Sequence, residues 1–375
     1  FISSFEHVTH RSLSSFMKWY STSGTPIVRI DEEKSAPQII KIQLEQSFEK
    51  QQNGVGVDLP LKMAWITNDG IVSPRVKLLN PQSSEVLKTQ DKEFLIVLRD
   101  LSLELEFEFE IPVVDTVLSF NRQFTSPIKV EKEFNLNHYK VLAKNDNDGF
   151  TKWDACQNVI FNYFNREISQ NRHVASTEFI DVVSELWLDQ LTSCDVNNYF
   201  TALYLALPSE DEINESFAIY QFNSVRSIAL SLKEGIAGKI RGKLLEKFMQ
   251  LEDVENQWTA KDMGIRKLKN IILDILLGIN DPVAIQYALM ALEQSKSMNQ
   301  QFSALCSLNK YDLAEGYGAN EIFIKRNKNM SLSIDKWLSA QMMNLKSRHL
   351  QKTLENLLES PYFDIKIPNR VYSLI

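Results

Sequence analysis

The sequence predicts two structural classes in series: a small antiparallel β-sandwich followed by a large all-α, α-solenoid-like array of helices. Residues 26–134 carry apolar side chains at alternate positions between closely spaced turn residues, which is the pattern of half-buried strands. From about residue 137 the apolar residues recur every three or four positions, as they do in amphipathic helices. We therefore divide the chain into a helical N-terminal segment (1–25), a β-sandwich domain (26–134) and a helical domain (135–375).

Strand patterns are clearest at IIKIQLEQSF (39–48), LKMAWIT (61–67), FLIVL (94–98) and LSLELEFEFEI (101–111). In the last of these, leucines and phenylalanines alternate with polar residues, of which four are glutamates: Glu104, Glu106, Glu108 and Glu110. Alternation places the two sets on opposite faces of a strand. Four carboxylates on one face could suggest a cation site or a catalytic pair. We interpret them instead as a solvated face that also protects a sheet edge.

Helical spacing covers 153–168, 178–191, 225–249, 266–279, 282–294 and 335–343. The connectors between several of these segments are short, for example GIND at 278–281. Successive helices joined by short loops are typical of an α-solenoid or an irregular helical array. No strict repeat period is visible, so a tetratricopeptide or ankyrin array is not expected.

Composition excludes several functional classes. The 375 residues carry 41 basic and 48 acidic side chains and a net charge of −7, which disfavours a nucleic-acid-binding face. No apolar run approaches the roughly 20 residues that span a bilayer, so no membrane partner is expected. The three cysteines, Cys156, Cys194 and Cys306, form no metal-binding pair and favour a reducing, cytoplasmic compartment. The first residue is not methionine and no signal peptide is visible, so we expect a fragment of a longer polypeptide.

No catalytic, cofactor-binding or metal-binding residues are predicted. His7 and His10 stand three residues apart, but a neighbouring glutamate base and a third ligand are missing, so an exposed helix face is expected. The stretch NDNDGFTKWD (145–154) is superficially similar to a calcium loop, yet Ala155 occupies the position of its last carboxylate. We interpret it as a turn and a helix start capped by Asn147 or Asp148. The basic stretch 239–247 is interpreted as a helix surface, with a partner or cavity wall as the alternative.

Four stretches, in order, resemble one family. SSFMKWYSTSGTPIV (14–28) is similar to the segment that ends the catalytic domain of bacterial-type aminopeptidase N, the zinc-dependent alanyl aminopeptidase of the gluzincin class. KNDNDGFTKWDACQ (144–157), MSLSIDKWLSAQ (330–341) and PNRVYSLI (368–375) resemble later segments of the same family. The similarity therefore extends over essentially the whole chain.

The resemblance implies that this chain is the C-terminal portion of such an enzyme without its catalytic domain. Residues 1–25 would be the last helices of that domain, and the helical domain, truncated at its C-terminus, would close over the active site and enclose a cavity. Zinc would be bound by the parent enzyme and not by this chain. The partners would be the missing catalytic domain, joined covalently or in trans, and peptide substrates. Asn369, Arg370 and Tyr372 would then be candidates for lining the substrate cavity.

The predicted function is accordingly a scaffold and active-site cap of a metallo-aminopeptidase, a hydrolase of peptide catabolism, that is inactive alone. Two alternatives remain: a stand-alone interaction module, and a non-covalent partner of a separately encoded catalytic half. The resemblance also implies that Phe16, Trp19 and Tyr20 pack within the missing catalytic domain or against the sandwich, with part of their apolar surface exposed in this chain.

Overall fold

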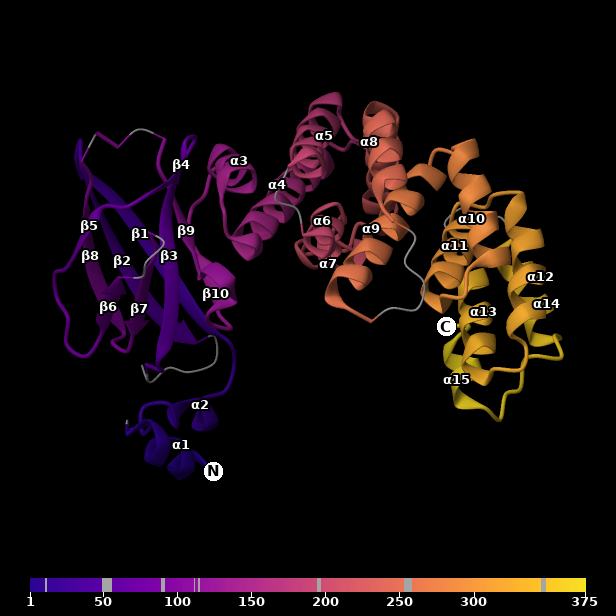
Figure 1. Ribbon diagram of the computed structural model, residues 1–375. Coiled ribbons are helices and arrows are strands. Elements are labelled where there is room, and N and C mark those ends of the chain that lie inside the picture. The colour runs from indigo at the N-terminus through magenta and orange to yellow at the C-terminus, as the bar shows by residue number, and fades with distance from the viewer. Residues whose placement is uncertain are drawn as a thin grey trace. The chain divides into compact units, whose positions relative to one another are not determined.

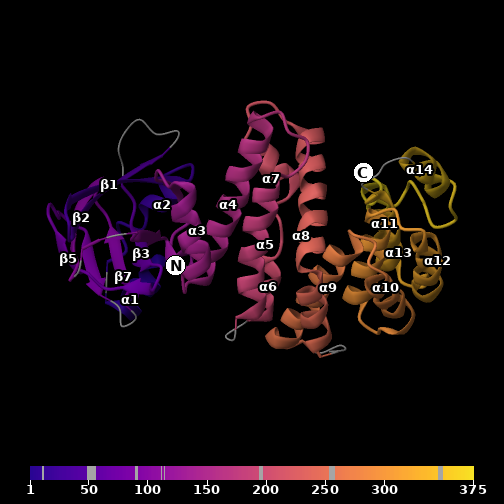
Figure 2. The same ribbon diagram turned by 90° about the horizontal axis from the view of Figure 1, so that it is seen from above.

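The computed structural model describes residues 1–10, 12–48, 56–88, 92–110, 112–113, 115–193, 197–252, 258–344 and 349–375. Its contacts divide the chain into two compact units, Phe1–Asn162 and Tyr163–Ile375. Figure 1 and Figure 2 show that the strands belong to the first unit and that the second is built of helices. The last strand ends at Glu131 and the next helix begins at Leu136. The limits of the three predicted domains stay a prediction.

Two five-stranded sheets form the sandwich. The first has the order β10-β1-β2-β8-β5, and the second has the order β4-β3-β7-β6 with β9 also paired to β3. The strands are β1 (Pro26–Ala36), β2 (Ile39–Phe48), β3 (Leu59–Thr67), β4 (Gly70–Val72), β5 (Arg75–Leu78), β6 (Glu85–Lys88), β7 (Phe94–Leu98), β8 (Ser102–Glu108), β9 (Val117–Phe120) and β10 (Lys129–Glu131). The predicted β-sandwich is confirmed, and β2 and β7 have the predicted limits.

One strand pair differs from the antiparallel prediction. β10 runs parallel to β1, with Ile27 opposite Lys129 and Arg29 opposite Glu131. After β9 the chain passes through the short 3₁₀ helix η1 (Arg122–Phe124) and reaches the edge of the other sheet. β1 and β10 are separated by the other strands of the sandwich and not by a tight hairpin, so they can run in the same direction.

The alternation in β8 is confirmed. Leu103, Leu105 and Phe107 are fully buried in the core between the sheets, while Glu104 and Glu108 are exposed. The edge-protecting role is wrong, however, because β8 lies between β2 and β5 and is not an edge strand. Strand pairing on both sides follows from contacts distant in sequence, which the local pattern does not reveal. Ile111, at the end of the predicted stretch, lies outside the described residues.

The helices that follow the sandwich confirm the predicted array. They are α3 (Leu136–Asn145), α4 (Gly149–Ser169), α5 (Thr177–Thr192), α6 (Asn198–Tyr204), α7 (Glu210–Glu215), α8 (Phe222–Gln250), α9 (Ala260–Leu277), α10 (Pro282–Gln294), α11 (Met298–Lys310), α12 (Glu315–Asn327), α13 (Ser331–Met342), α14 (Leu350–Leu358) and α15 (Pro368–Tyr372). In the second unit α5 packs against α8, α6 against α9 and α10 against α11.

Capping explains where two of these helices begin. α10 starts as predicted, because Pro282 occupies its first turn and the Asp281 carboxylate accepts the Val283 N–H at 2.9 Å. α9 starts six residues earlier than the apolar pattern indicates, since the hydroxyl of Thr259 accepts the Asp262 N–H at 3.2 Å. Lys261 and Asp262 interrupt the apolar pattern in the first turn, so the pattern becomes clear only from the second turn onward.

The N-terminal segment forms α1 (Ile2–Thr9) and the single-turn helix α2 (Lys18–Ser21). Among the described residues, a helix with the length and apolar character needed to cross a membrane is not found.

Candidate functional site

The N-terminal segment is attached to the sandwich through Trp19. Its indole N–H donates to the Asp58 carbonyl oxygen at 3.2 Å, and the ring packs against the buried core between the sheets. The Ser15 hydroxyl donates to the Asp58 carboxylate at 2.6 Å, which fixes the same turn a second time. The prediction that Trp19 packs against the sandwich is confirmed.

Phe16 and Tyr20 remain largely exposed beside this attachment. Their exposed fractions are 40% and 68%, and their rings contact each other edge to face with centroids 6.3 Å apart. Together with Trp19, Pro60 and Pro127 they line an open, mainly apolar hollow of about 480 Å³. Exposed apolar surface of this kind is typical of a contact face for another domain or protein.

A buried polar network joins the sandwich to the start of α4. The guanidinium of Arg122, 1% exposed, contacts Glu93 Oε1 at 2.8 Å and Asp146 Oδ1 at 2.7 Å. It also donates to the Ser119 hydroxyl at 2.9 Å and to the Asn147 side-chain oxygen at 2.5 Å. Lys62 approaches the other Glu93 oxygen at 2.5 Å. Burial of charge on this scale is tolerated only where every charge is paired.

The stretch that is superficially similar to a calcium loop contributes Asp146 and Asn147 to this network. Asp146 accepts from Arg122 with one carboxylate oxygen and from the Thr151 hydroxyl, at 2.8 Å, with the other. Asp148 accepts the Thr151 N–H at 3.0 Å, so it caps the first turn of α4. The prediction of a turn and a capped helix start is confirmed. Sequence reasoning missed Arg122 and Glu93, because neither stands in a motif.

The three predicted cavity residues lie together on the short helix α15. Asn369 and Tyr372 are exposed, whereas Arg370 is buried. The guanidinium of Arg370 lies 2.6 Å from the Asp335 carboxylate of α13, donates to Ser331 Oγ at 3.2 Å and hydrogen-bonds the Tyr362 carbonyl. Two of the family-like stretches, those with Asp-Lys-Trp and Pro-Asn-Arg, therefore meet through this ion pair.

A second charged cluster surrounds Asp274 of α9. Its carboxylate contacts the ammonium groups of Lys310 and Lys233 at 3.3 and 3.8 Å. It accepts hydrogen bonds from Ser307 at 2.9 Å and Tyr311 at 3.1 Å. Burial acts to raise the pKa of Asp274, but the two ammonium groups hold it below its usual value. The cluster connects α8, α9 and α11, and the single Asp274 carboxylate forms ion pairs with both lysines.

Burial lowers the pKa of Lys233 to about 8, against the attraction of Asp274. We expect Lys233→Met to raise the free energy of unfolding at pH 7 by about 1 to 2 kcal/mol, since a partly buried ammonium is replaced by an apolar chain of similar length. The folded pKa lies below that of an unfolded lysine, about 10.4, so the unfolded chain binds more protons between these values. Raising the pH through this window should therefore stabilise the wild type. The difference in free energy of unfolding between the variant and the wild type, called the stability gap below, should then become smaller.

Chemical unfolding of the wild type and the variant at pH 7, 8, 9 and 10 measures the stability gap. The difference between the two proteins is the relevant quantity, because burial also raises the pKa of the Cys306 thiol to about 12 and lowers the stability of both proteins at high pH. Lys239→Met is the matched control, since Lys239 lies on the same helix and is exposed. A gap that does not change with pH would contradict the prediction.

The basic stretch 239–247 lies on α8 and is engaged in ion pairs. Lys239 pairs with Asp181, Arg241 with the Asp281 carboxylate that caps α10, and Lys243 with Glu246 at 2.8 Å. These contacts support the interpretation of a polar helix surface.

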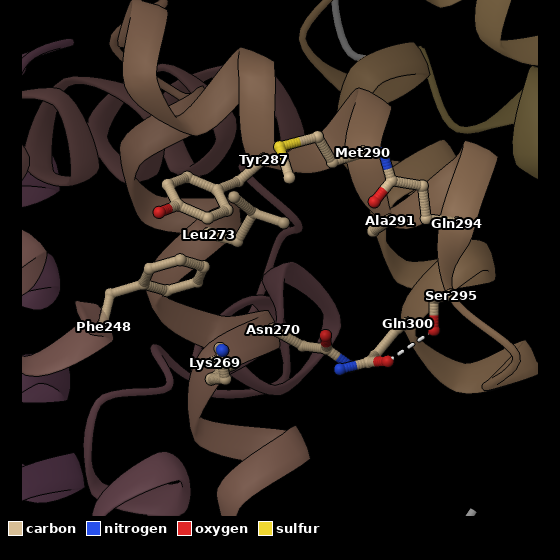
Figure 3. Close-up of a pocket in the computed structure, with 10 residues that line it drawn as sticks. All are labelled: Phe248, Lys269, Asn270, Leu273, Tyr287, Met290, Ala291, Gln294, Ser295 and Gln300. Atoms are coloured by element: carbon tan, nitrogen blue, oxygen red, sulfur yellow. Dashed lines mark hydrogen bonds between the residues drawn. The ribbon is translucent and has the colours of Figure 1, made fainter. Parts of the chain in front are cut away.

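A smaller cavity of about 180 Å³ lies among α8, α9, α10 and α11. Figure 3 shows the rings of Phe248 and Tyr287 on one side and the amides of Asn270 and Gln300 on the other. The rings contact each other at 5.0 Å, and the Lys269 ammonium lies 4.9 Å from the Phe248 centroid. Ser295 donates to Gln300 at 2.6 Å. The volume of this cavity is below the range that is usual for ligand sites.

Metal ligands do not converge anywhere in the described part of the chain: it contains no group of three His, Cys, Asp or Glu residues that could hold an ion. His7 and His10 are exposed on and just after α1. Cys306 is a free thiol, Cys156 is buried, and Cys194 lies outside the described residues.

The helical region matches a family described as "Domain of unknown function (DUF3458_C) ARM repeats" over residues 137–375. The chain belongs to this family. ARM repeats are helical solenoids, in agreement with the array of short-looped helices. The predicted α-solenoid character of the second part of the chain is confirmed.

Curated relatives extend the match to the whole chain. Aminopeptidase N of Escherichia coli (strain K12) is 22% identical and that of Haemophilus influenzae is 23% identical, each over 100% of this chain but only 42% of the relative. Aminopeptidase N of Caulobacter vibrioides is 24% identical over the whole chain and 41% of its own length. The predicted resemblance to aminopeptidase N is confirmed, and the chain spans less than half the length of these relatives.

The fold is shared with a solved structure. The crystal structure of Legionella pneumophila aminopeptidase A in complex with aspartic acid matches 99% of this chain and 42% of that one, with a TM-score of 0.77 and 19% identity. At this identity the likeness shows the fold of the chain.

Proposed function

We propose that this chain is the C-terminal scaffold and active-site cap of a zinc metallo-aminopeptidase that removes N-terminal residues from peptides. One observation carries the proposal: the whole chain matches about two fifths of each aminopeptidase N relative. The exposed apolar hollow formed by Phe16, Trp19 and Tyr20 supports it, because this face offers the catalytic portion a surface to pack against.

In this proposal the helical array controls access to the active site. A helical cap admits peptides that can enter the enclosed space and excludes bulk water from it. The zinc ion and its ligands belong to the catalytic portion, outside this chain. Asn369 and Tyr372, exposed on α15, are the side chains of the predicted cavity set that are available to a substrate, whereas Arg370 is engaged with Asp335. We also propose a cytoplasmic location, which the free thiol of Cys306 supports.

The test is hydrolysis of an alanyl chromogenic amide by three preparations supplied with zinc: the chain alone, a polypeptide that continues toward its N-terminus to the length of the relatives, and the chain mixed with that additional portion made separately. We expect no hydrolysis and no bound zinc for the chain alone, and hydrolysis by the longer polypeptide. Activity of the mixture would favour assembly in trans.

Activity of the chain alone in proportion to one equivalent of zinc would overturn the proposal. His7→Ala and His10→Ala would then be the first variants to make. An inactive longer polypeptide that binds zinc would favour the alternative of an interaction module.

A further inference from the structure

A cavity of about 480 Å³ lies within the first unit, between the last strands of the sandwich and the helices α3 and α4. Aromatic side chains form much of its wall, including Phe124, Phe134, Tyr139 and Phe150. Phe124 contacts Phe150 with ring centroids 5.1 Å apart, and Phe134 contacts Tyr139 at 5.2 Å. A cavity of this size is large enough for a small organic molecule.

One carboxylate faces this aromatic wall without a cationic partner. Asp154 of α4 lines the cavity, is accessible to solvent and accepts from the Asn158 amide at 3.2 Å. Over the residues that the structure describes, no basic side chain forms an ion pair with Asp154. Although the side chain is accessible to solvent, desolvation by the protein around it raises the pKa of Asp154 to about 6. An ionised carboxylate in such surroundings is stabilised by a positive charge supplied from outside.

Another part of the lining already holds an ammonium group between an aromatic ring and a carboxylate. β10 contributes Lys129 and Glu131 to the lining, and Lys132 follows directly after the strand. The Lys132 ammonium lies 5.0 Å from the centroid of the Phe134 ring and 2.5 Å from the Glu32 carboxylate. An aromatic ring together with a carboxylate is a standard binding arrangement for organic cations. Lys132 is thereby neutralised by Glu32, while Asp154 is left for another cation.

We propose that this cavity binds a small organic ammonium ion, with its charge beside Asp154 and its apolar part against the aromatic wall. The size, the ring lining and the Asp154 carboxylate together select this class of ligand. A carboxylate or phosphate would be repelled by Asp154, and a neutral aromatic molecule would gain no ion pair. The site is separate from the Asp335–Arg370 pair and from the apolar hollow at Trp19.

The probe is phenethylammonium, with 2-phenylethanol as its neutral analogue and phenylacetate as its anionic one. Titration calorimetry at pH 7.5 should show the ammonium binding at least about tenfold more tightly than the alcohol, which corresponds to about 1.4 kcal/mol. Phenylacetate should bind more weakly than the alcohol. Asp154→Asn should remove the preference for the ammonium, and Asp154→Glu should retain most of it. Glu104→Gln, on the solvated face of β8, is the control that should change nothing.

The pH dependence gives a second measurement that needs no variant. Protonation of Asp154 below about pH 6 should weaken the binding of phenethylammonium and leave that of 2-phenylethanol unchanged. The other ionisable groups of the lining are Tyr139 of α3, Lys129 and Glu131 of β10, and Lys132 just after that strand. Equal affinities for the ammonium and the alcohol, no binding by the folded wild type, or unchanged binding by a folded Asp154→Asn variant would each overturn the proposal.

Discussion

Replacing Arg122 by methionine is expected to lower the free energy of unfolding of the first unit by about 3 to 5 kcal/mol. The substitution keeps much of the side-chain volume but removes the charge between Glu93 and Asp146, whose side chains are almost completely buried. Lys62 still neutralises Glu93, but Asp146 loses the one ion pair that it forms within the described residues. A buried carboxylate that loses its cation is among the few changes that reach this magnitude.

The measurement must report on the first unit, because a chain with two compact units need not unfold in one step. Native-state hydrogen exchange of the amides in β3 and β9 meets this requirement, since these strands belong to the sheet beside Arg122. Arg29→Met is the matched control. Arg29 is exposed on β1 and pairs with the exposed Asp31, so its loss should cost less than about 0.5 kcal/mol.

A loss below about 1 kcal/mol for Arg122→Met, with Arg29→Met unchanged, would contradict the importance of the network. The double variant Arg122→Met with Asp146→Asn separates the two contributions. If the main cost is the unpaired carboxylate, the double variant should recover part of the stability lost in the single variant.

Periodic and local signals account for what the sequence predicts well. β2, β7 and α10 have the predicted limits, because each combines an unbroken apolar pattern with turn or capping residues at its ends. The resemblance to aminopeptidase N in addition assigned the stretches around Trp19 and Asp146 to particular segments of that family. Neither source placed the parallel strand β10, whose partner β1 lies about a hundred residues earlier.

The polar contacts within the fold were not predictable for a related reason. Arg122 meets Glu93 and Asp146 across 29 and 24 residues, and no spacing rule connects them. Asp154 belongs to the family-like stretch Trp-Asp-Ala-Cys-Gln, yet its position in an aromatic cavity depends on β10 and α3. The pairing of Asp335 with Arg370 likewise joins two recognised stretches that the sequence alone leaves separate.

Replacing Arg370 by methionine is expected to lower the stability of the C-terminal end of the array by about 2 to 4 kcal/mol. The change breaks the ion pair with Asp335 and the hydrogen bonds to Ser331 and the Tyr362 carbonyl, so α15 loses its polar attachment to α13. Hydrogen exchange of the α13 and α15 amides should rise first, because this end of the chain would open locally. The exposed Tyr372, changed to alanine, is the control and should cost less than about 0.5 kcal/mol.

The Arg370→Met and Tyr372→Ala variants also distinguish a structural role of α15 residues from a role in binding substrate in the cavity. In a polypeptide that includes the catalytic portion, a structural Arg370 predicts loss of protection in α13 and α15 and recovery of stability when Asp335→Asn is added. A substrate-binding Arg370 instead predicts a higher KM for peptides with unchanged protection. Since the guanidinium is already engaged by three groups of this chain, we expect the first result for Arg370→Met and a KM effect confined to Asn369 and Tyr372. Unchanged exchange in the Arg370→Met variant would contradict the structural role.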